Sequence, residues 1–419
     1  MGFSLIIFGA GVVLLVLVAA NLAALFYTTA GQLSAAAHQR QQESEWFSER
    51  LAVARTQLRR AENIGSWNGT RKFQIQRIVP ECSEVASFYL VPHDGRPLPG
   101  FLPGQFLTFE LDVPGQKGRT IRCYSLSDRP RPDYYRVTIK RVPAPPEPLG
   151  LKPGLVSNHF HTAFKAGDLL DVKAPGGGFF LDVSQATPVV LLSGGVGITP
   201  MISMANEISA NSPQREVWFF LSVRNRREHI FKEHLEELAR TNPRLRLQIC
   251  YSRPEAGDLA GRDYQHEGRL TIDLLRRVLP ANNFDYFMCG PGPMMSDLND
   301  GLRAWGVPEK HIHFEAFGPA SVKRTAPPAA TPVGPAARVN FVRSNRDVEW
   351  SATHDSLLDL ALNEGVSISY ACRAGNCGTC KTAIKSGKVT YRKQPGCDVE
   401  SGSCLTCVAV PEGDLRLDA

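Results

Sequence analysis

Residues 372–380 read CRAGNCGTC, and this stretch decides the fold of the C-terminal part of the chain. Ten cysteines are present in 419 residues, and six of them lie between positions 372 and 407. A disulfide scaffold would be short and evenly rich in cysteine, which this chain is not. The cluster of cysteines therefore indicates a metal centre, whereas the scattered Cys82, Cys123 and Cys250 are expected to be small buried side chains.

The cysteine spacing C-x4-C-x2-C, with a fourth cysteine further on, is that of a plant-type [2Fe–2S] centre. Three thiolates, from Cys372, Cys377 and Cys380, are expected to converge on it from one loop. Gly375 and Gly378 let the backbone of that loop fold closely around the cluster and aim N–H groups at the sulfur atoms.

The fourth ligand has three candidates, Cys397, Cys404 and Cys407. Zinc, which prefers paired C-x2-C knuckles, stays as an alternative because Cys404 and Cys407 have that spacing. The stretch 404–411, CLTCVAVP, resembles the end of plant-type ferredoxins, where the ligand follows a Leu-Thr pair and precedes an apolar strand and a proline. The resemblance implies Cys407 as the fourth ligand and a β-grasp [2Fe–2S] ferredoxin domain over residues 337–419.

A different pattern marks an α/β domain over residues 185–318. The apolar run PVVLLSG (188–194) is typical of a buried parallel strand, and the turn GGVGITP (194–200) follows it. Later strand-like runs alternate with helical stretches, which predicts a doubly wound sheet with a ligand crevice at the carboxyl ends of its strands. In such a turn, backbone N–H groups approach a pyrophosphate at the start of a helix.

Residues 67–184 contain five or six short alternating runs separated by Gly and Pro, which predicts a small antiparallel β-barrel. The motif RCYS (122–125) lies within them. An Arg fork can neutralise a pyrophosphate, and a Tyr two residues on points to the same face, where its ring can cover a flavin. Further along, GLVS (154–157) offers N–H groups and a hydroxyl to phosphate at a helix start. Taken alone, the four-residue motif also fits a polar strand edge.

In this order, PGQF (103–106), RCYS (122–125) and GLVS (154–157) resemble the ferredoxin–NADP reductase superfamily. They are especially similar to the FAD domain of flavohemoglobin reductase modules, and the whole arrangement is phthalate-dioxygenase-reductase-like. The glycine turn, together with CGPGPM (289–294), resembles the nicotinamide-binding half of the same superfamily, and EAFGP (315–319) resembles its closing segment. The resemblance implies FAD, although a related subgroup uses FMN with a similar motif.

The resemblance also implies roles for individual residues. The implied FAD-binding residues, among which Cys123 is expected to be incidental, are Phe106, Arg122, Cys123, Tyr124, Ser125, Lys140, Gly154, Val156, Ser157, Glu315, Phe317 and Gly318. The implied NAD(P)-binding residues are Gly194, Gly195, Gly197, Thr199, Pro200, Arg224, Ser252, Arg253, Cys289, Gly290 and Pro291. Those expected to lie at the reacting atoms are Tyr124, Ser125, Thr199, Cys289 and Phe317.

The choice between NADH and NADPH stays open. A 2′-phosphate needs cationic or hydroxyl partners near the adenosine ribose. Ser252-Arg253 follows a strand end at the place where NADP-using relatives hold that phosphate, and Arg224 follows the preceding strand. The same arginines would also suit a solvated loop.

Residues 3–27 carry no charge, which predicts a transmembrane helix within residues 1–29. At about 1.5 Å per residue this helix would span roughly 37 Å, enough for the hydrocarbon core. A cleaved signal peptide is the alternative, but the apolar run is longer than a usual signal-peptide core. Basic residues follow the helix, so the positive-inside rule places a helical stalk (30–66) and the catalytic domains on the cytoplasmic side of a single-pass anchor.

A Pro/Ala-rich tether (319–336) separates the nicotinamide and ferredoxin domains. Together the modules predict an electron-transfer oxidoreductase. It would transfer a hydride from NAD(P)H to FAD and pass single electrons through [2Fe–2S] to a partner protein. The main hypothesis is the reductase component of a membrane-associated oxygenase, such as a hydroxylase, desaturase or cytochrome P450. The alternatives are a reductase of a hybrid-cluster protein and a redox-sensing or scaffolding protein without turnover. A net charge of +6 without a basic, aromatic-rich stretch excludes a nucleic-acid binder.

Overall fold

The computed structural model describes residues 67, 69–116, 118–143, 153–317, 337–351, 354–375, 377–392, 395, 397 and 399–419. All of these belong to one compact unit, Gly65–Ala419. The predicted anchor (1–29), stalk (30–66) and tether (319–336) lie outside the described residues. Among the residues that are described, no helix is both long and apolar enough to cross a membrane.

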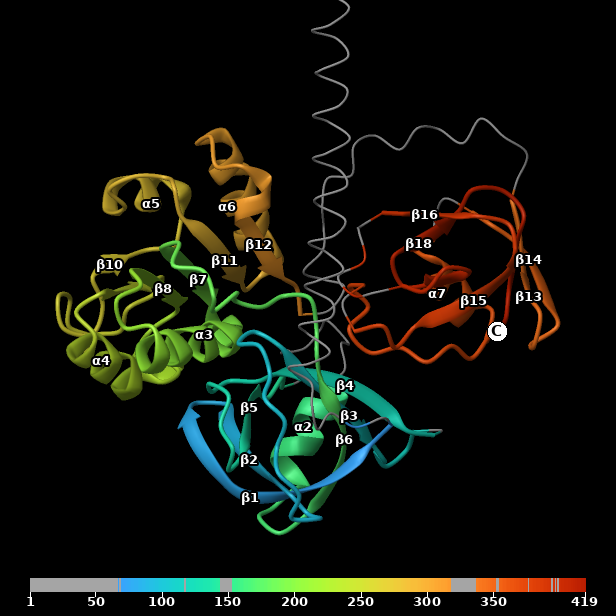
Figure 1. Ribbon diagram of the computed structural model, residues 1–419, viewed down its shortest axis with the longest axis horizontal. Coiled ribbons are helices and arrows are strands. Elements are labelled where there is room, and N and C mark those ends of the chain that lie inside the picture. Colours follow the sequence, from blue (N-terminus) through green and yellow to red (C-terminus); the bar gives the residue numbers. More distant parts are fainter. Residues whose placement is uncertain are drawn as a thin grey trace, which may run out of the picture. The chain divides into compact units, whose positions relative to one another are not determined.

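The first domain is an antiparallel sheet that closes on itself (Figure 1). Six strands pair in the order β4-β3-β6-β1-β2-β5. An isolated antiparallel bridge between Leu126 and Val137 joins the ends of the two outer strands, which makes the sheet a barrel. Its interior is filled by apolar side chains such as Phe73, Phe88 and Phe109, and by Phe160 from helix α2. The elements are β1 Arg71–Cys82, β2 Val85–Pro92, β3 Phe106–Leu111, β4 Thr120–Ser125, β5 Tyr135–Lys140, α2 Leu155–Thr162 and β6 Leu169–Gly176.

The second domain is a parallel sheet with the strand order β10-β9-β8-β7-β11-β12. Alternate residues of β7 enter different cores: Val189 and Leu191 pack with α3 and α4, while Val190 and Leu192 pack with α5 and α6. Helices therefore cover both faces, as the predicted doubly wound fold requires. The elements are β7 Val189–Gly194, η1 Gly195–Gly197, α3 Ile198–Asn211, β8 Val217–Val223, η2 Arg226–Glu228, α4 Lys232–Thr241, β9 Leu245–Tyr251, β10 His266–Glu267, α5 Ile272–Val278, β11 Asp285–Cys289, α6 Gly292–Ala304, η3 Glu309–His311 and β12 Ile312–Glu315.

The strand order of this second sheet reverses between β7 and β11. β7 is followed by β8 on one side of it, and β11 is followed by β12 on the other side. Because these two connections leave in opposite directions, a crevice opens beyond the carboxyl ends of β7 and β11. The turn after β7 and the Cys289–Gly290 segment after β11 both lie at that edge. The fold therefore brings together two motifs that are about ninety residues apart in the sequence.

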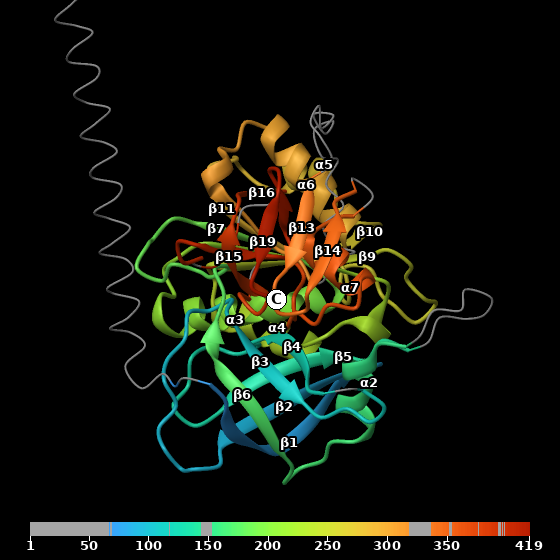
Figure 2. The ribbon, with the colours of Figure 1, turned by 90° about the vertical axis from the view of Figure 1, so that its right-hand side faces the viewer.

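The third domain is a small mixed sheet packed on one short helix. The strand order is β14-β13-β19-β15-β17, with β13 and β19 parallel, and Figure 2 shows β14, β13, β19 and β15 side by side. Helix α7 begins at Ser356, whose hydroxyl accepts a hydrogen bond from the N–H of Asp359 at 3.1 Å. The elements are β13 Arg338–Phe341, β14 Arg346–Glu349, α7 Leu357–Asn363, β15 Lys381–Ser386, β16 Val389–Tyr391, β17 Ser403–Leu405, β18 Ala409–Pro411 and β19 Leu415–Leu417.

Candidate flavin, nicotinamide and cluster sites

Strand β4 presents the flavin motif. Arg122 and Tyr124 are two residues apart, so they lie on the same face of the strand. The ring of Tyr124 packs edge-on against Phe160 and Phe109, with centroids 5.3 and 5.8 Å apart, and this burial raises the pKa of its hydroxyl. Tyr124 is therefore a neutral, firmly held aromatic. The intervening Cys123 has its Sγ 3.4 Å from Thr108 Oγ1 on strand β3.

Among the described residues, the guanidinium of Arg122 makes one hydrogen bond. Its Nη1 donates to the carbonyl oxygen of Ile121 at 2.7 Å. A guanidinium has five N–H donors in a planar fork, so the remaining ones suit a phosphate group. This arrangement fits the diphosphate of FAD.

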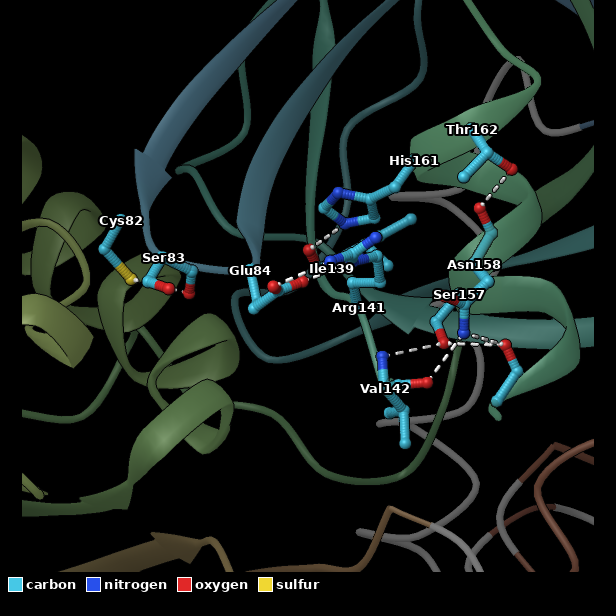
Figure 3. A network of polar contacts seen from close by, with 11 residues as sticks. Cys82, Ser83, Glu84, Ile139, Arg141, Val142, Ser157, Asn158, His161 and Thr162 are labelled. Carbon is cyan, nitrogen blue, oxygen red and sulfur yellow. Dashed lines mark hydrogen bonds and ion pairs between the residues drawn. The ribbon is translucent and has the colours of Figure 1, made fainter. Parts of the chain in front are cut away.

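Helix α2 begins against the loop that leaves β5, and Figure 3 shows the contacts that join them. The Ser157 hydroxyl donates to the carbonyl of Gly154 at 3.2 Å and accepts from the N–H of Val142 at 3.3 Å. The Asn158 amide donates to the carbonyls of Val142 and Gly154 at 2.6 and 2.8 Å. A Cβ at Gly154 would lie 2.7 Å from Ser157 Oγ, so this helix start requires glycine.

These contacts change the role expected for two predicted FAD ligands. The hydroxyl of Ser157 already serves the helix start, and Val156 is buried in the barrel core. The backbone N–H groups in the first turn of helix α2 have no acceptor within the helix. These groups are therefore the ones that α2 could offer to a phosphate. Phe106 is buried under Gly177, where a Cβ would lie 2.7 Å from the ring, and Lys140 ends β5.

The turn after β7 packs directly on the segment after β11. A Cβ at Gly194 would lie 2.7 Å from Pro291, and one at Gly290 would lie 3.0 Å from the Gly194 nitrogen. A Cβ at Gly197 would overlap the carbonyl of Cys289. These three glycines allow the two loops to touch through their backbones.

Gly195 has a different reason to be glycine. Its φ is +53°, in the left-handed region, and a Cβ there would meet nothing within 4 Å. The turn therefore exposes its backbone to open space just before helix α3, as a pyrophosphate cradle requires. In the first turn of α3, the Thr199 hydroxyl donates to the Val196 carbonyl at 3.0 Å, and Pro200 follows it.

Three predicted residues meet where β4, β11 and β12 end. The hydroxyl of Ser125 donates to the carboxylate of Glu315 at 3.4 Å across 190 residues of sequence. Cys289 and Glu315 are register partners on the parallel strands β11 and β12. All three side chains are buried, and burial together with the Glu315 charge raises the pKa of the Cys289 thiol. The end of the flavin motif on β4 and the end of β11 therefore converge on one buried point.

The last predicted flavin contacts lie just beyond β12. Phe317 is 42% exposed. Gly318 lies outside the described residues. The aromatic cover predicted from EAFGP stays a prediction.

The loops after β8 and β9 are adjacent, as 2′-phosphate recognition would need. The N–H of Ser252 donates to Val223 at 2.9 Å, and the N–H of Arg253 donates to Arg224 at 2.8 Å. Arg224, however, is paired with Glu228. Within the part of the chain that the structure describes, the Arg253 side chain has no ion pair, so it is the better candidate for a phosphate ligand.

We expect Arg253→Ala to raise the KM for NADPH by about tenfold or more and to leave the KM for NADH nearly unchanged, because a charge-assisted contact to phosphate is worth about 1.5–3 kcal/mol. Steady-state kinetics with both cofactors measure this. Arg227→Ala is the matched control, since Arg227 pairs with Glu255 at 3.0 Å. An equal rise for both cofactors would remove the case for 2′-phosphate recognition.

The cluster loop brings sulfur atoms and backbone donors together. The N–H of Cys372 points to Cys377 Sγ at 3.5 Å, and the N–H of Ala374 points to Cys372 Sγ at 3.4 Å. The neighbouring Cys407 side chain lowers the pKa of the Cys380 thiol. Gly375 and Gly378 both have positive φ, at 78° and 70°, as the tight loop requires.

The other two cysteines of this region occupy different positions. Cys404 is fully buried in the domain core, and burial raises its pKa to about 12. The Sγ of Cys397 lies 3.8 Å from the Gly375 carbonyl. Cys407, the fourth ligand implied by CLTCVAVP, is buried beside Cys380, and its role stays a prediction.

Within the described ranges, no group of three or more His, Cys, Asp or Glu side chains is arranged to hold a single metal ion. A [2Fe–2S] cluster has two irons, and four cysteines supply two sulfur ligands to each. The two cysteine pairs, Cys372 with Cys377 and Cys380 with Cys407, fit that demand better than they fit zinc.

Comparisons with known proteins match all three domains. Residues 73–181 match the oxidoreductase FAD-binding domain, residues 191–300 the oxidoreductase NAD-binding domain, and residues 340–412 the 2Fe-2S iron-sulfur cluster binding domain.

Among curated relatives, the flavohemoprotein of Bacillus cereus is 38% identical over 261 residues, which is 62% of this chain and 64% of that protein. The flavohemoprotein of Rhizobium meliloti is 40% identical over 262 residues, with the same shares of 62% and 64%. The chain thus covers just under two thirds of the length of these relatives.

Two solved structures extend the comparison. The FAD/NAD-binding domain of nitric oxide dioxygenase from Vibrio cholerae is 33% identical with a TM-score of 0.53, and covers 60% of this chain and 100% of its own. Phthalate dioxygenase reductase is 26% identical with a TM-score of 0.52, and covers 84% of this chain and 98% of its own.

Proposed function

The chain belongs to the ferredoxin-reductase type of NAD(P)H-dependent flavin and iron–sulfur oxidoreductases, and we propose that it is the reductase component of a membrane-associated oxygenase. In this role electrons would pass from NAD(P)H through FAD and the [2Fe–2S] cluster to an acceptor protein. The acceptor would be a hydroxylase, a desaturase or a cytochrome P450.

The observation that carries this proposal is the match to phthalate dioxygenase reductase over nearly the whole length of that protein. That protein has a modular structure for electron transfer from pyridine nucleotides to [2Fe-2S]. The present chain has an FAD-binding, an NAD-binding and a 2Fe-2S domain, in that order along the sequence. The match to the FAD/NAD-binding domain of nitric oxide dioxygenase supports the flavin chemistry and says nothing of the acceptor.

The residues at the end of β4 would prepare the hydride step. Bound FAD supplies hydride acceptance and bound [2Fe–2S] supplies single-electron transfer. Ser125 holds its hydroxyl toward Glu315 at 3.4 Å, so both polar groups are oriented before a nucleotide arrives. The buried, neutral Cys289 adds no charge of its own beside Glu315 at the same point. Thr199, in the first turn of α3, would position the nicotinamide beside it.

The test uses the full chain purified in detergent, with its flavin, iron and acid-labile sulfide content measured first. On mixing with NADH or NADPH, the flavin absorption should bleach before cytochrome c is reduced. Incubation with candidate oxygenase components should then show which acceptor the reduced protein serves. A purified protein without bound flavin and without iron and sulfide in equal amounts would refute the proposal.

A membrane anchor is part of the proposal, and it rests on the sequence of residues 3–27. These residues carry no charge, and arginines follow them. A single anchor of this kind would hold the catalytic domains on the cytoplasmic side, close to a membrane-bound acceptor and to reduced nicotinamide cofactor.

We expect Leu15→Asp to release a large fraction of the full chain from the membrane pellet, because an Asp at the centre of a spanning helix costs about 2.5–3.5 kcal/mol. Extraction of membranes at alkaline pH, followed by immunoblotting, measures the distribution. Leu15→Ala is the matched control and should stay in the pellet. Recovery of the unmodified chain in the supernatant would argue against an anchor.

A further inference from the structure

Helix α3 is tied to the flavin-binding barrel by a polar cluster that the motifs do not include. The hydroxyl of Ser203 donates to the carbonyl oxygen of Asp128 at 2.7 Å. The amide of Asn206 donates to the carboxylate of Asp128, also at 2.7 Å. All three residues are buried, with exposures of 8% for Asp128, 0% for Ser203 and 7% for Asn206. These three residues are called the Asp128 clamp below.

On the barrel side, the clamp is held by several further bonds. The Asp128 carboxylate also accepts from the Tyr134 hydroxyl at 2.7 Å and from the N–H of Arg129 at 2.8 Å. Burial works to raise the pKa of Asp128, but the nearby Arg136 guanidinium and the hydrogen bonds outweigh it and keep that pKa below its usual value. Asp128 is therefore a fixed, ionised acceptor rather than a mobile surface carboxylate.

On the nucleotide side, the clamp continues into helix α4. The Nε2 of His234 lies 2.7 Å from the Asn206 side-chain oxygen, which fixes the orientation of the amide. Nearby, the Arg136 guanidinium of the barrel lies over the ring of Phe231, 4.8 Å from its centroid, at the start of α4. Both helices that follow the strands β7 and β8 are thus attached to the same part of the barrel.

The clamp lies close to the reacting point along both chain segments. Asp128 is three residues beyond Ser125, and the backbone between them is held to β5 because the N–H of Ser127 donates to Arg136 at 2.8 Å. On α3, Thr199, Ser203 and Asn206 are spaced i, i+4 and i+7, which places them on one face of the helix. The face of α3 on which Thr199 lies is therefore the face that the barrel holds.

We propose that Asp128, Ser203 and Asn206 are positioning residues for hydride transfer, which set the depth and angle at which the nucleotide-binding helix meets the flavin. This inference rests on the NAD(P)H-to-flavin part of the proposed function. A displacement of about 1 Å at a reacting centre can lower a rate by about 100-fold. Loss of the clamp should therefore slow flavin reduction more than it weakens nucleotide binding.

The test variant is Asn206→Asp, which places a second carboxylate against that of Asp128. In stopped-flow mixing with saturating NADH or NADPH, the limiting rate of flavin reduction should fall about 10- to 100-fold, while the dissociation constant of the oxidised nucleotide should change about threefold or less. Asn211→Asp is the matched control, because it makes the same chemical change at the exposed end of the same helix, beside Glu207. This control should keep the rate of the unmodified protein.

The rescue variant is the exchange Asp128→Asn with Asn206→Asp, which restores one amide facing one carboxylate. It should recover most of the lost rate. It should also recover the midpoint of thermal unfolding that Asn206→Asp lowers, measured without nucleotide. A single variant as fast as the unmodified protein, or an exchange variant as slow as the single one, would overturn the proposal.

Failure of the proposed function would look different. In that case the unmodified protein itself would show no flavin reduction by NADH or NADPH. The recovery of the unfolding midpoint in the exchange variant would then still decide whether the clamp holds the helix to the barrel.

Discussion

Replacing Cys377 by alanine is expected to abolish the visible absorption and the electron paramagnetic resonance signal of the iron–sulfur cluster. Ferricyanide reduction by the flavin should continue, because the flavin accepts hydride in a separate domain. Cytochrome c reduction should fall close to zero if that protein takes its electrons from the cluster. The physical reason is that a [2Fe–2S] cluster needs four thiolates, and Cys377 would supply one of them from the loop in which the Cys372 nitrogen lies 3.5 Å from the Cys377 sulfur.

The matched controls for this prediction are the two neighbouring cysteines. Cys397→Ala should keep the cluster, although its sulfur lies close to the same loop. Cys404→Ala should also keep it, with a loss of stability only, because Cys404 is a buried core residue on β17. Loss of the cluster in either control would mean that the ligand set is wrong. Loss of flavin reduction together with the cluster in Cys377→Ala would mean that the domains do not work separately.

The second large effect is expected from Gly197→Ala. The added methyl group would overlap the carbonyl of Cys289, so the turn after β7 or the segment after β11 must move. Either movement displaces the nucleotide from the flavin, and NAD(P)H-driven flavin reduction should fall about 100-fold or more. Stopped-flow absorption at the flavin band measures this rate, and dithionite should reduce the same flavin as in the unmodified protein.

Gly257→Ala is the appropriate control for this substitution. Gly257 is in the same domain, and a Cβ there would meet nothing within 4 Å and no left-handed backbone is involved. Its rate should equal that of the unmodified protein. A Gly197→Ala variant with an unchanged rate would show that the close packing of the two loops is not needed for nucleotide binding.

The predicted cofactors and the predicted type of enzyme are confirmed by the matches to FAD-binding, NAD-binding and 2Fe-2S domains. The barrel, the doubly wound sheet and the ferredoxin domain are also present. The membrane anchor, the individual site residues and the acceptor stay predictions. The anchor lies outside the described residues. The acceptor is a separate protein, so this chain alone does not identify it.

Some predicted site residues already have partners within the protein. The hydroxyl of Ser157 is bound within the start of helix α2, and Val156 is in the barrel core. Arg224 is paired with Glu228 and so is a poorer phosphate ligand than Arg253. A motif records which residue types occur, but the partners that a side chain has already acquired depend on the surrounding loops.

By itself, the sequence of this protein determined the three domains and the type of cofactor in each. Alternation of apolar residues, glycine turns and cysteine spacing are local properties, because they depend on neighbours within a few residues. Only the tertiary structure decided that Ser125 meets Glu315 across 190 residues, and that Asp128 holds Ser203 and Asn206 of helix α3. Such contacts arise from how sheets and helices pack, and no short stretch of sequence encodes which distant partner will lie opposite a given side chain.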